Sequence, residues 1–516
     1  MRPELAANAY DAIPYPGAVQ NWTHPDQLAT KALLAGLRPA ALESCRVLEL
    51  GCGDGTNLTN MAFGLPGGRF LGIDLARKPL EGAIALAEKL GIKNLEFRCA
   101  DILGLGSDLG EFDFIVIPGL YSWVPAAVRD KLLELCGQCL APHGVAVVSY
   151  NAYPGSFASN MVREMMAYQV RSIEDPAKQI RQARGLVNLL LRCQGEPKAY
   201  KAALEQEMKR IAGYSDGVLF HDDLNPHYHP VYFHQFMEHA GRHGLQYLGE
   251  RCENALDAGD YPEQIRPALR QLSECGIIER EQYLDFIHGR RFRCTFLCRE
   301  EAAPQRGIEV GQLNDLRVGI SREMDVNILI DADGLRFVSD EATLASTNHP
   351  LIVAAVSYLL QERPRSVPFA ELLEAAQADE NVTEANVTDP ERDARMLGAF
   401  VLRCYLTRLL DLGTWQPPCV AHPSARPVAS ALARALVRCT PLVPSLRHDC
   451  VAILDELGHR LLELLDGTHD RSSLLAELNA IVATNHLPLP DGATAVTPAM
   501  VEEKLEALAR LGLLSD

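Results

Sequence analysis

Short apolar runs alternate with longer amphipathic segments along the first 150 residues of the chain. The apolar runs have the length of buried strands, and the segments between them repeat apolar positions at the helical period. Strands that alternate with helices form a parallel sheet covered on both faces, which binds ligands at the carboxyl ends of its strands. The predicted strands are RVLEL (46–50), RFLGIDLA (69–76), NLEFRCADI (94–102), EFDFIVIPG (111–119) and residues 145–151, the last after a turn at Pro142–Gly144.

The pattern becomes continuously helical from about Ser156 to Ile211, and two further strands follow at 244–250 and 290–299. We expect these strands to close the sheet as an antiparallel pair. The helical segment is then an insertion above the ligand edge, suited to substrate contact or dimerisation; a cap that only shields the ligand is the alternative. The predicted segments are a core at 1–155, an insertion at 156–215 and completion of the sheet at 216–300.

A polar linker at 300–307 leads into a mainly helical region. Leucine pairs in this region recur with a constant shift of 102 residues, for example from Leu359-Leu360 to Leu461-Leu462. The shift suggests two diverged copies, 308–415 and 416–516, each of three helices with a short extended piece, close to a winged-helix module. Winged helices often bind DNA, but basic residues do not cluster here, so docking of a protein is favoured.

The turn after the first predicted strand, in VLELGCGDGTN (47–57), contains three glycines. Glycines let a ligand approach the backbone, and this turn leads from a strand into a helix. Asp74 ends the second strand and Asp101 follows the third. An acidic residue at the tip of the second strand binds ribose hydroxyls in nucleotide-binding βαβ units. The combination predicts a nucleotide site, whereas the turn alone also fits simple strand-to-helix packing.

The glycine spacing G-x-G-x-G differs from the G-x-G-x-x-G of dinucleotide-binding folds. With the acidic strand ends, it resembles the class I S-adenosylmethionine-dependent methyltransferases. The resemblance implies that Glu49 and the turn approach the methionine part of the cofactor, that Asp74 holds the ribose, and that Asp101 accepts from the adenine amino group. The implied cofactor-binding residues are Tyr15, His24, Glu49, Gly51, Cys52, Gly53, Asp54, Gly55, Asn57, Asp74, Leu75, Asp101, Ile102 and Pro118.

Longer motifs resemble a narrower group, the bacterial protein-lysine methyltransferases that carry a methyltransferase regulatory domain. The motifs are AYDAIPYP (9–16), WTHPDQLAT (22–30), GLYSWVP (119–125), VSYNAYPG (148–155) and PVYFHQFMEHAGRHGLQYLGE (230–250). The resemblance implies a Rossmann-like seven-stranded methyltransferase sheet with a helical insertion, followed by a mainly helical, winged-helix-like C-terminal region. It further implies a protein substrate in an open cavity and a homodimer formed through the inserted helices. The group includes enzymes that modify outer-membrane proteins.

Aromatic residues after the fourth and fifth predicted strands are candidates for the acceptor pocket. A lysine ammonium, with a reference pKa of about 10.4, must lose its proton before it attacks a methyl group. Ring faces attract the cation, and apolar walls lower its pKa. The predicted catalytic residues are Tyr121, Trp123, Tyr150 and Tyr153, with Asn151 orienting the amine. The alternative is that the four aromatics are core residues at the edges of the sheet.

The segment from Tyr10 to Pro25 precedes the first predicted strand and is expected to fold over the cofactor as a lid. Tyr15 and His24 are its candidates for contact with the methionine carboxylate, against ordinary N-terminal packing. The histidines from His221 to His234 match no metal-ligand spacing, and methyl transfer needs no metal, so none is expected.

Composition narrows the choice of substrate and compartment. The formal net charge is −18, from 49 basic and 67 acidic residues, which disfavours a nucleic-acid partner. The Asn/Asp-Pro-Pro-aromatic and Pro-Cys signatures of DNA-base methyltransferases are also missing from the fourth-strand exit. The fourteen cysteines follow no disulfide or zinc spacing, and the N-terminus has no signal-peptide pattern, so a cytoplasmic protein is expected.

The longest apolar run, LIVAAVSYLL (351–360), is about half the length that a membrane span needs. No membrane span is therefore expected. The interpretation from sequence is a methyltransferase acting on protein lysines. A small-molecule methyltransferase and a non-catalytic regulator that senses S-adenosylmethionine are the alternatives, and an NAD oxidoreductase is a more distant one.

Overall fold

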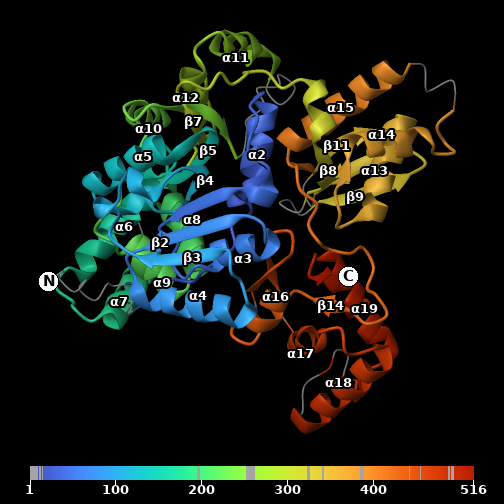
Figure 1. Ribbon diagram of the computed structural model, residues 1–516. Coiled ribbons are helices and arrows are strands. Elements are labelled where there is room, and N and C mark those ends of the chain that lie inside the picture. Colours follow the sequence, from blue (N-terminus) through green and yellow to red (C-terminus); the bar gives the residue numbers. More distant parts are fainter. Residues whose placement is uncertain are drawn as a thin grey trace.

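The protein is described by a computed structural model. The described residues are 10, 13, 15–193, 198–251, 262–321, 326–339, 342–383, 389–440, 442–453, 455–485, 489 and 493–515. Figure 1 shows a sheet domain built from the first 300 or so residues, with a middle domain and a C-terminal domain on one side of it. The parts of the predicted core, lid and linkers that fall in the gaps lie outside the described residues.

A seven-stranded sheet with the order β3-β2-β1-β4-β5-β7-β6 forms the centre of the first domain. Its strands are β1 (Arg46–Leu50), β2 (Arg69–Asp74), β3 (Leu95–Cys99), β4 (Phe112–Ile117), β5 (Leu140–Asn151), β6 (Leu245–Glu250) and β7 (Phe292–Arg299). The first five strands are parallel, and β7 runs antiparallel to both β5 and β6. The Rossmann-like seven-stranded fold predicted from the sequence is confirmed.

The start of the fifth strand differs from the prediction. Residues Pro142–Gly144 are part of β5, which already begins at Leu140, where it pairs with Phe112 of β4. The expected turn is therefore wrong. The pairing with β4 shifts register between Phe112 and Phe114, and it is regular from Val145 onward, where the fifth strand was expected to begin.

Helices cover both faces of the sheet, as the alternating pattern predicted. One face packs against α5 (Ala126–Cys139) and α10 (Phe233–Gly241) through fully buried residues such as Leu132 and Phe236. The other packs against α2 (Pro25–Leu34) and α3 (Thr56–Gly64) through residues such as Leu28 and Leu58. Helix α4 (Arg77–Leu90) lies beside β3. The loops at the carboxyl ends of β1, β2 and β4 are thereby brought to one edge.

The predicted helical insertion is confirmed and has a core of its own. Its helices are α6 (Phe157–Val170), α7 (Pro176–Arg192) and α8 (Lys198–Ala212), followed by a short α9 (Asp216–Val218) and a π-helical turn, η6 (Leu219–Asp223). Val162, Ala183, Leu204 and Leu219 from four of these elements pack together. The insertion returns the chain to the sheet through η6, so η6 reaches the ligand edge between the insertion and β4.

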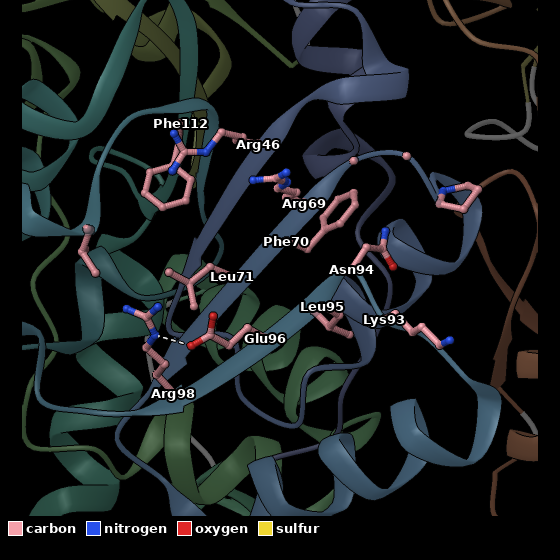
Figure 2. A pocket seen from close by; sticks show the side chains of 14 residues that line it. Arg46, Arg69, Phe70, Leu71, Lys93, Asn94, Leu95, Glu96, Arg98 and Phe112 are labelled. Carbon is pink, nitrogen blue, oxygen red and sulfur yellow. Dashed lines mark hydrogen bonds and ion pairs between the residues drawn. The ribbon is translucent and has the colours of Figure 1, made fainter.

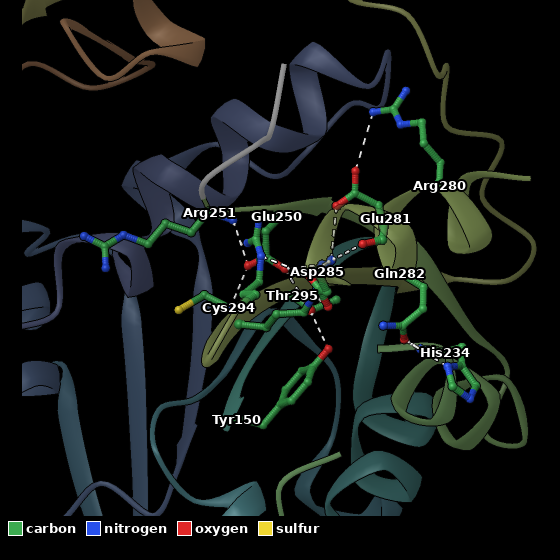
Figure 3. Close-up of polar contacts among 12 residues, drawn as sticks. Tyr150, His234, Glu250, Arg251, Arg280, Glu281, Gln282, Asp285, Cys294 and Thr295 are labelled. Atoms are coloured by element: carbon green, nitrogen blue, oxygen red, sulfur yellow. Dashed lines mark hydrogen bonds and ion pairs between the residues drawn. The ribbon is translucent and has the colours of Figure 1, made fainter. Parts of the chain in front are cut away.

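A buried ion cluster joins α12 (Ile277–His288) to the last two strands (Figure 3). Arg293 of β7 is fully buried and bonds Glu250 of β6 and Asp285 of α12, each at 2.8 Å. Glu281 of α12 lies 3.3 Å from the same guanidinium. A buried charge persists when it is paired and hydrogen-bonded, so this cluster fixes α12, which follows α11 (Arg266–Ser273), against the edge of the sheet.

The middle and C-terminal domains have separate cores. The middle domain contains β8 (Arg317–Ile320), β9 (Asn327–Asp331), β10 (Gly334–Val338), β11 (Thr343–Thr347), α13 (Pro350–Glu362), β12 (Val367–Pro368), α14 (Phe369–Gln377), α15 (Pro390–Leu406) and β13 (Leu410–Gly413). The C-terminal domain contains β14 (Val428–Ala429), α16 (Ala431–Leu436), β15 (Leu442–Pro444), β16 (Cys450–Ala452), α17 (Glu456–Leu464), α18 (Arg471–Asn485), α19 (Pro498–Arg510) and β17 (Leu514–Ser515).

The leucine pairs that suggested a repeat lie on corresponding helices of the two domains. Leu359-Leu360 lies on α13 and Leu461-Leu462 on α17, and the later pairs follow on α14 and α18. A common origin of the two domains stays a prediction. The apolar run at 351–360 is the centre of α13, and none of the helices in the described ranges combines the length and hydropathy needed to cross a bilayer.

Candidate active site

The glycine turn leaves one side of its backbone open. Gly51, Gly53 and Gly55 all have positive φ values, of 76°, 57° and 71°. A Cβ at Gly55 would come within 2.5 Å of the Phe97 ring, so close packing requires glycine there. A Cβ at Gly53 would meet no atom within 4 Å. Conformation requires glycine at this second position, and its open side is where a ligand can lie against bare peptide.

Asp74 ties the glycine turn to the end of β2. Its Oδ2 accepts from the Gly53 amide at 2.8 Å, and its Oδ1 accepts from the Ala76 amide, also at 2.8 Å. Asp101 is exposed after β3 and accepts from the Leu103 amide at 3.0 Å. The sequence-predicted acidic pair therefore lies beyond adjacent strand ends, at the edge where nucleotides bind in this architecture.

Glu49 is buried beneath the turn with one oxygen unsatisfied. Its Oε1 accepts from the Asn57 amide at 3.1 Å, whereas Oε2 is buried without a hydrogen-bond partner. Burial is the main reason that the pKa of Glu49 rises to about 8, with smaller contributions from Asp54 and Asp74. A buried carboxyl with a free acceptor atom fits the amino group of a methionine moiety.

Two of the predicted acceptor aromatics are core residues. Tyr121 is 2% exposed, and its hydroxyl bonds His239 Nδ1 at 2.8 Å. Tyr150 is 1% exposed, and its hydroxyl bonds Thr295 at 3.0 Å. Both rings pack against Phe236 of α10. The prediction that they line the acceptor pocket is wrong, because α10 covers both rings.

Trp123 remains at the strand exit, and it has partners that the sequence did not reveal. Its ring lies 4.9 Å from that of Tyr228, and the Arg163 guanidinium of α6 lies over both rings, at 5.2 and 4.1 Å. The His229 amide donates to the Ser122 carbonyl at 2.8 Å, which holds the Tyr228 segment against the end of β4. Trp123 and Tyr228 together form an aromatic wall.

The two predicted site residues at the end of β5, Asn151 and Tyr153, have different surroundings. The Asn151 amide donates to Ser122 Oγ at 2.8 Å, so this backbone is joined to the same strand exit. Tyr153 stacks on Phe157 with ring centroids 4.3 Å apart, at the start of α6. The amine-orienting role of the Asn151 side chain and the pocket role of Tyr153 stay predictions.

The N-terminal segment meets η6 beside the cofactor edge. The Tyr15 hydroxyl donates to Asp222 Oδ2 at 3.3 Å, and the Tyr10 ring stacks on His221 at 3.8 Å. Burial chiefly raises the pKa of Tyr10 to about 12, and Asp222 and Asp74 both contribute. Tyr10 is thus close enough to feel the charges of both carboxylates. Tyr10 and Tyr15 therefore lie against η6, and a lid over the cofactor stays a prediction.

Asp222 is the most perturbed acid on this side of the site. It is half-buried, and its pKa rises to about 7 because of burial first and the neighbouring Asp223 second. Asp223 itself pairs with Arg210 at 2.8 Å. π-Helical turns are rare and occur often at functional sites, so η6 marks Asp222 as a candidate site residue. The composition and spacing of the sequence could not reveal this turn.

His24 does not lie where the predicted carboxylate role requires. It is 4% exposed, and its Nδ1 accepts from the Asp26 amide at the start of α2. Its ring packs between Trp415 and His448, at 4.8 and 4.9 Å. This placement contradicts contact with the methionine carboxylate, because the ring is enclosed between domains. The chain segment that buries it lies almost 400 residues away.

A histidine–aspartate group and a basic cavity are further features of the sheet domain. Asp130, His239 and His243 have ligand atoms within 4.8 Å of one another, the one such group found among the described residues. Hydrogen bonds already join them, and we assign them no part in methyl transfer.

A cavity of about 490 Å³ opens at the amino ends of β1 to β4 (Figure 2). It includes Arg46, Arg69 and Phe112 and lies at the sheet edge opposite the glycine turn.

Comparisons with known proteins agree with this arrangement. A methyltransferase domain model matches residues 47–144, a predicted methyltransferase regulatory domain matches 215–299, and the PKMT C-terminal winged helix domain matches 425–513. The solved structure of PKMT2 from Rickettsia typhi is 27% identical, covers 97% of this chain and 100% of its own, and has a TM-score of 0.83. The same protein has also been solved in complex with AdoHcy.

Two proteins of Rickettsia prowazekii extend the comparison. RP789 is 28% identical over 97% of this chain and 91% of its own length. RP028 is 35% identical over 46% of this chain and 96% of its own length. The chain belongs to the bacterial protein-lysine methyltransferase family with a methyltransferase regulatory domain. It is an S-adenosylmethionine-dependent methyltransferase, and its regulatory-domain segment supplies η6, α10 and the last two strands of the sheet.

The raised pKa of Glu49 predicts that this methyltransferase binds its cofactor more tightly as the pH rises toward 8. Glu49 is mainly protonated below its pKa of about 8, and an ammonium placed against Oε2 favours the carboxylate. Binding then releases a proton, so the Kd for S-adenosylhomocysteine falls by up to about tenfold per pH unit between pH 6 and 8. Calorimetry in buffers of different ionisation enthalpy measures the proton release. A Kd independent of pH would contradict the contact.

Proposed function

We propose that the protein transfers methyl groups from S-adenosylmethionine to lysine side chains of a protein substrate. The similarity to PKMT2 extends over the whole of that chain, and the matched winged-helix domain is a domain of PKMT, a protein-lysine methyltransferase. The observation that supports lysine as the methyl acceptor comes from the side chains around η6 and the exit of β4. A carboxyl with a raised pKa, Asp222, is next to Asp223, whose carbonyl bonds Arg163, and Arg163 lies over the rings of Trp123 and Tyr228.

This arrangement suits a long aliphatic side chain that ends in a cation. Ring faces of Trp123 and Tyr228 pack against methylene groups and attract an ammonium. Arg163 lies over both rings and is bonded to the Asp223 and Asn225 carbonyls, so the aromatic wall is tied to the segment that carries Asp222. Asp222 supplies the opposite charge, and its bond to Tyr15 links the acceptor side to the lid. A carboxylate acceptor would meet like charge here, which argues against acidic substrates.

The chemistry requires one proton transfer and one displacement. Asp222 takes a proton from the lysine ammonium, which frees the nitrogen lone pair. Burial brings the pKa of Asp222 to about 7, closer to that of lysine than an ordinary aspartate, so the transfer is less uphill. The lone pair then attacks the sulfonium methyl in line, the carbon–sulfur bond breaks, and its electron pair stays on sulfur. The products are a methylated ammonium and neutral S-adenosylhomocysteine.

Replacing Trp123 by Ala is expected to lower kcat about tenfold and leave the Kd for S-adenosylhomocysteine within about twofold of wild type. The change removes the stacking surface for the acceptor side chain, worth on the order of 1 kcal/mol or more, but touches no residue of the glycine turn. Trp123→Phe is the matched control because it keeps a ring face, and it should retain most of the turnover. Equal losses of turnover and cofactor binding in Trp123→Ala would contradict an acceptor role.

Labelled methyl transfer into bacterial lysate tests the proposed function. Label in protein, recovered as methyl-lysine by mass spectrometry, supports it, and the Asp74→Ala protein is the background control. Label confined to small molecules would instead favour a small-molecule methyltransferase. Cofactor binding with no transfer would favour a sensing regulator. The labelled protein also tests the predicted outer-membrane class of substrate, and light scattering tests the predicted homodimer.

A further inference from the structure

The C-terminal domain reaches directly behind the glycine turn. The loop between β15 and β16 inserts His448 against the first turn of α3, where it is 2% exposed. Its Nε2 lies 3.1 Å from Asn57 Oδ1, and its Nδ1 lies 2.9 Å from Asn60 Nδ2. Asn60 also donates to the Ser445 carbonyl of the same loop. Four atoms of two α3 amides and one imidazole therefore form a buried contact between domains.

The hydrogen bonds define one protonation state of this contact. The Gln20 backbone amide donates to Asn57 Oδ1, so that atom is an acceptor. His448 Nε2 must then carry the hydrogen and donate to it, which leaves Nδ1 to accept from Asn60. Burial holds the pKa of His448 well below its usual value, so the ring is neutral, as these bonds require.

The same asparagine orients the buried acid of the cofactor site. Asn57 Nδ2 donates to Glu49 Oε1 at 3.1 Å, on the side of the amide away from His448. A hydrogen-bonded chain thus runs from the C-terminal domain through Asn57 to Glu49. His448 adopts this position with a φ of +60°, a left-handed conformation that a non-glycine residue holds at a cost. Simple packing between domains does not require such a backbone.

We infer that the C-terminal domain completes the cofactor site, with His448 as a positioning residue. His448 holds the Asn57 amide in the orientation that leaves Glu49 Oε2 free for the cofactor. The domain for which the sequence suggested substrate docking or regulation is therefore part of the methyltransferase machinery, although His448 touches neither the methyl donor nor the acceptor. The inference concerns the cofactor side and does not depend on the acceptor being lysine.

Contacts other than those of His448 hold the C-terminal domain in place, because the end of the middle domain is bonded to α2 and the C-terminal domain is bonded to the middle domain. Asp26 of α2 accepts from Thr414 Oγ1 at 2.8 Å and from the Trp415 amide at 3.0 Å. The Trp415 ring stacks on His24. Arg447, the neighbour of His448, pairs with Asp411 of β13 at 3.3 Å. Truncating His448 alone should therefore remove the bond to Asn57 and leave the domain in place.

Calorimetric titration of S-adenosylhomocysteine into the full chain tests the inference. His448→Ala is expected to raise the Kd about 5- to 50-fold, because Asn57 Oδ1 loses a buried donor and the amide is then held less firmly, by its remaining bonds to Gln20, Thr23 and Glu49. In turnover assays the KM for S-adenosylmethionine should rise more than kcat falls. His448→Gln can place an amide donor near the same point and should recover most of the affinity. Asn60→Ala removes a hydrogen bond to the His448 ring and should also raise the Kd for S-adenosylhomocysteine.

His459→Ala is the matched control. His459 lies on α17 of the same domain, bonds the Ile453 carbonyl at 2.7 Å and lies 3.8 Å from Glu456, both within that domain. Its Kd should equal that of the wild type. The inference is overturned if His448→Ala, with an unchanged melting temperature, binds as tightly as wild type. It is also overturned if His448→Gln binds as weakly as His448→Ala, since loss of packing then explains the effect.

Discussion

The Asp74→Ala protein is expected to bind S-adenosylhomocysteine at least about 100-fold more weakly than the wild type. Asp74 holds the glycine turn and is predicted to bind the ribose, and the substitution removes both interactions. Its oxygens accept from the amides of Gly53 and Ala76, so the carboxylate shapes the glycine turn as well as the ribose side. Two predicted hydrogen bonds from the ribose hydroxyls to the charged carboxylate would contribute about 1.5–3 kcal/mol each, and the loss of both exceeds a factor of 100 in the Kd. Calorimetry on the purified full chain measures the Kd for S-adenosylhomocysteine.

Matched variants separate the two tasks of Asp74. Asp74→Asn keeps one oxygen for a backbone amide but lacks the charge, so it should bind between wild type and Asp74→Ala. Asp108→Ala removes an exposed acid of the same domain and should leave the Kd unchanged. Wild-type affinity in Asp74→Ala would contradict the assignment of the cofactor to this edge and, with it, the interpretation of the turn.

The pattern of apolar residues was sufficient to predict the sheet, because each strand is marked by the apolar residues of its own short segment. The runs at β1, β2 and β4 are apolar and nearly fully buried, as parallel strands covered on both faces must be. The positive φ values of the three glycines and the position of Asp74 at the end of β2 could likewise be predicted, since both belong to local βα turns, and their contacts with the cofactor stay predictions. Their functional positions follow from topology: parallel strands bring consecutive turns to one edge.

Side chains at the acceptor side could not be assigned in this way. Tyr121 and Tyr150 follow the right strands, but whether a ring faces a ligand or the core depends on what covers it. Phe236, about 100 residues later, covers both. Asp222, Tyr228 and His448 were missed for the same reason, because each acts on elements distant in sequence. The signal that could have pointed to Asp222 was its place in His221-Asp222-Asp223, at the start of the histidine-rich run for which a metal site was rejected.

The Asp222→Asn protein is expected to lose at least about 100-fold in kcat, within the range for removal of a general base. Asparagine is close in size but neither attracts an ammonium nor takes its proton. The Kd for S-adenosylhomocysteine should stay within about twofold, since Asp222 bonds the lid at Tyr15 and not the glycine turn. Methyl transfer into the labelled protein fraction measures kcat, and calorimetry measures the Kd.

The pH profile distinguishes a base from a merely structural carboxyl. Asp222 has a raised pKa of about 7 in the free protein, so the reactive carboxylate is depleted as the pH falls below 7. Wild-type kcat/KM should therefore fall on the acid side with a break near 7, added to the titration of the lysine itself, and Asp222→Asn should lose that break. Asp216→Asn, an exposed acid paired with Arg184 in the neighbouring turn, should keep it. An unchanged break in Asp222→Asn would assign the proton transfer to another group, even if the rate had fallen.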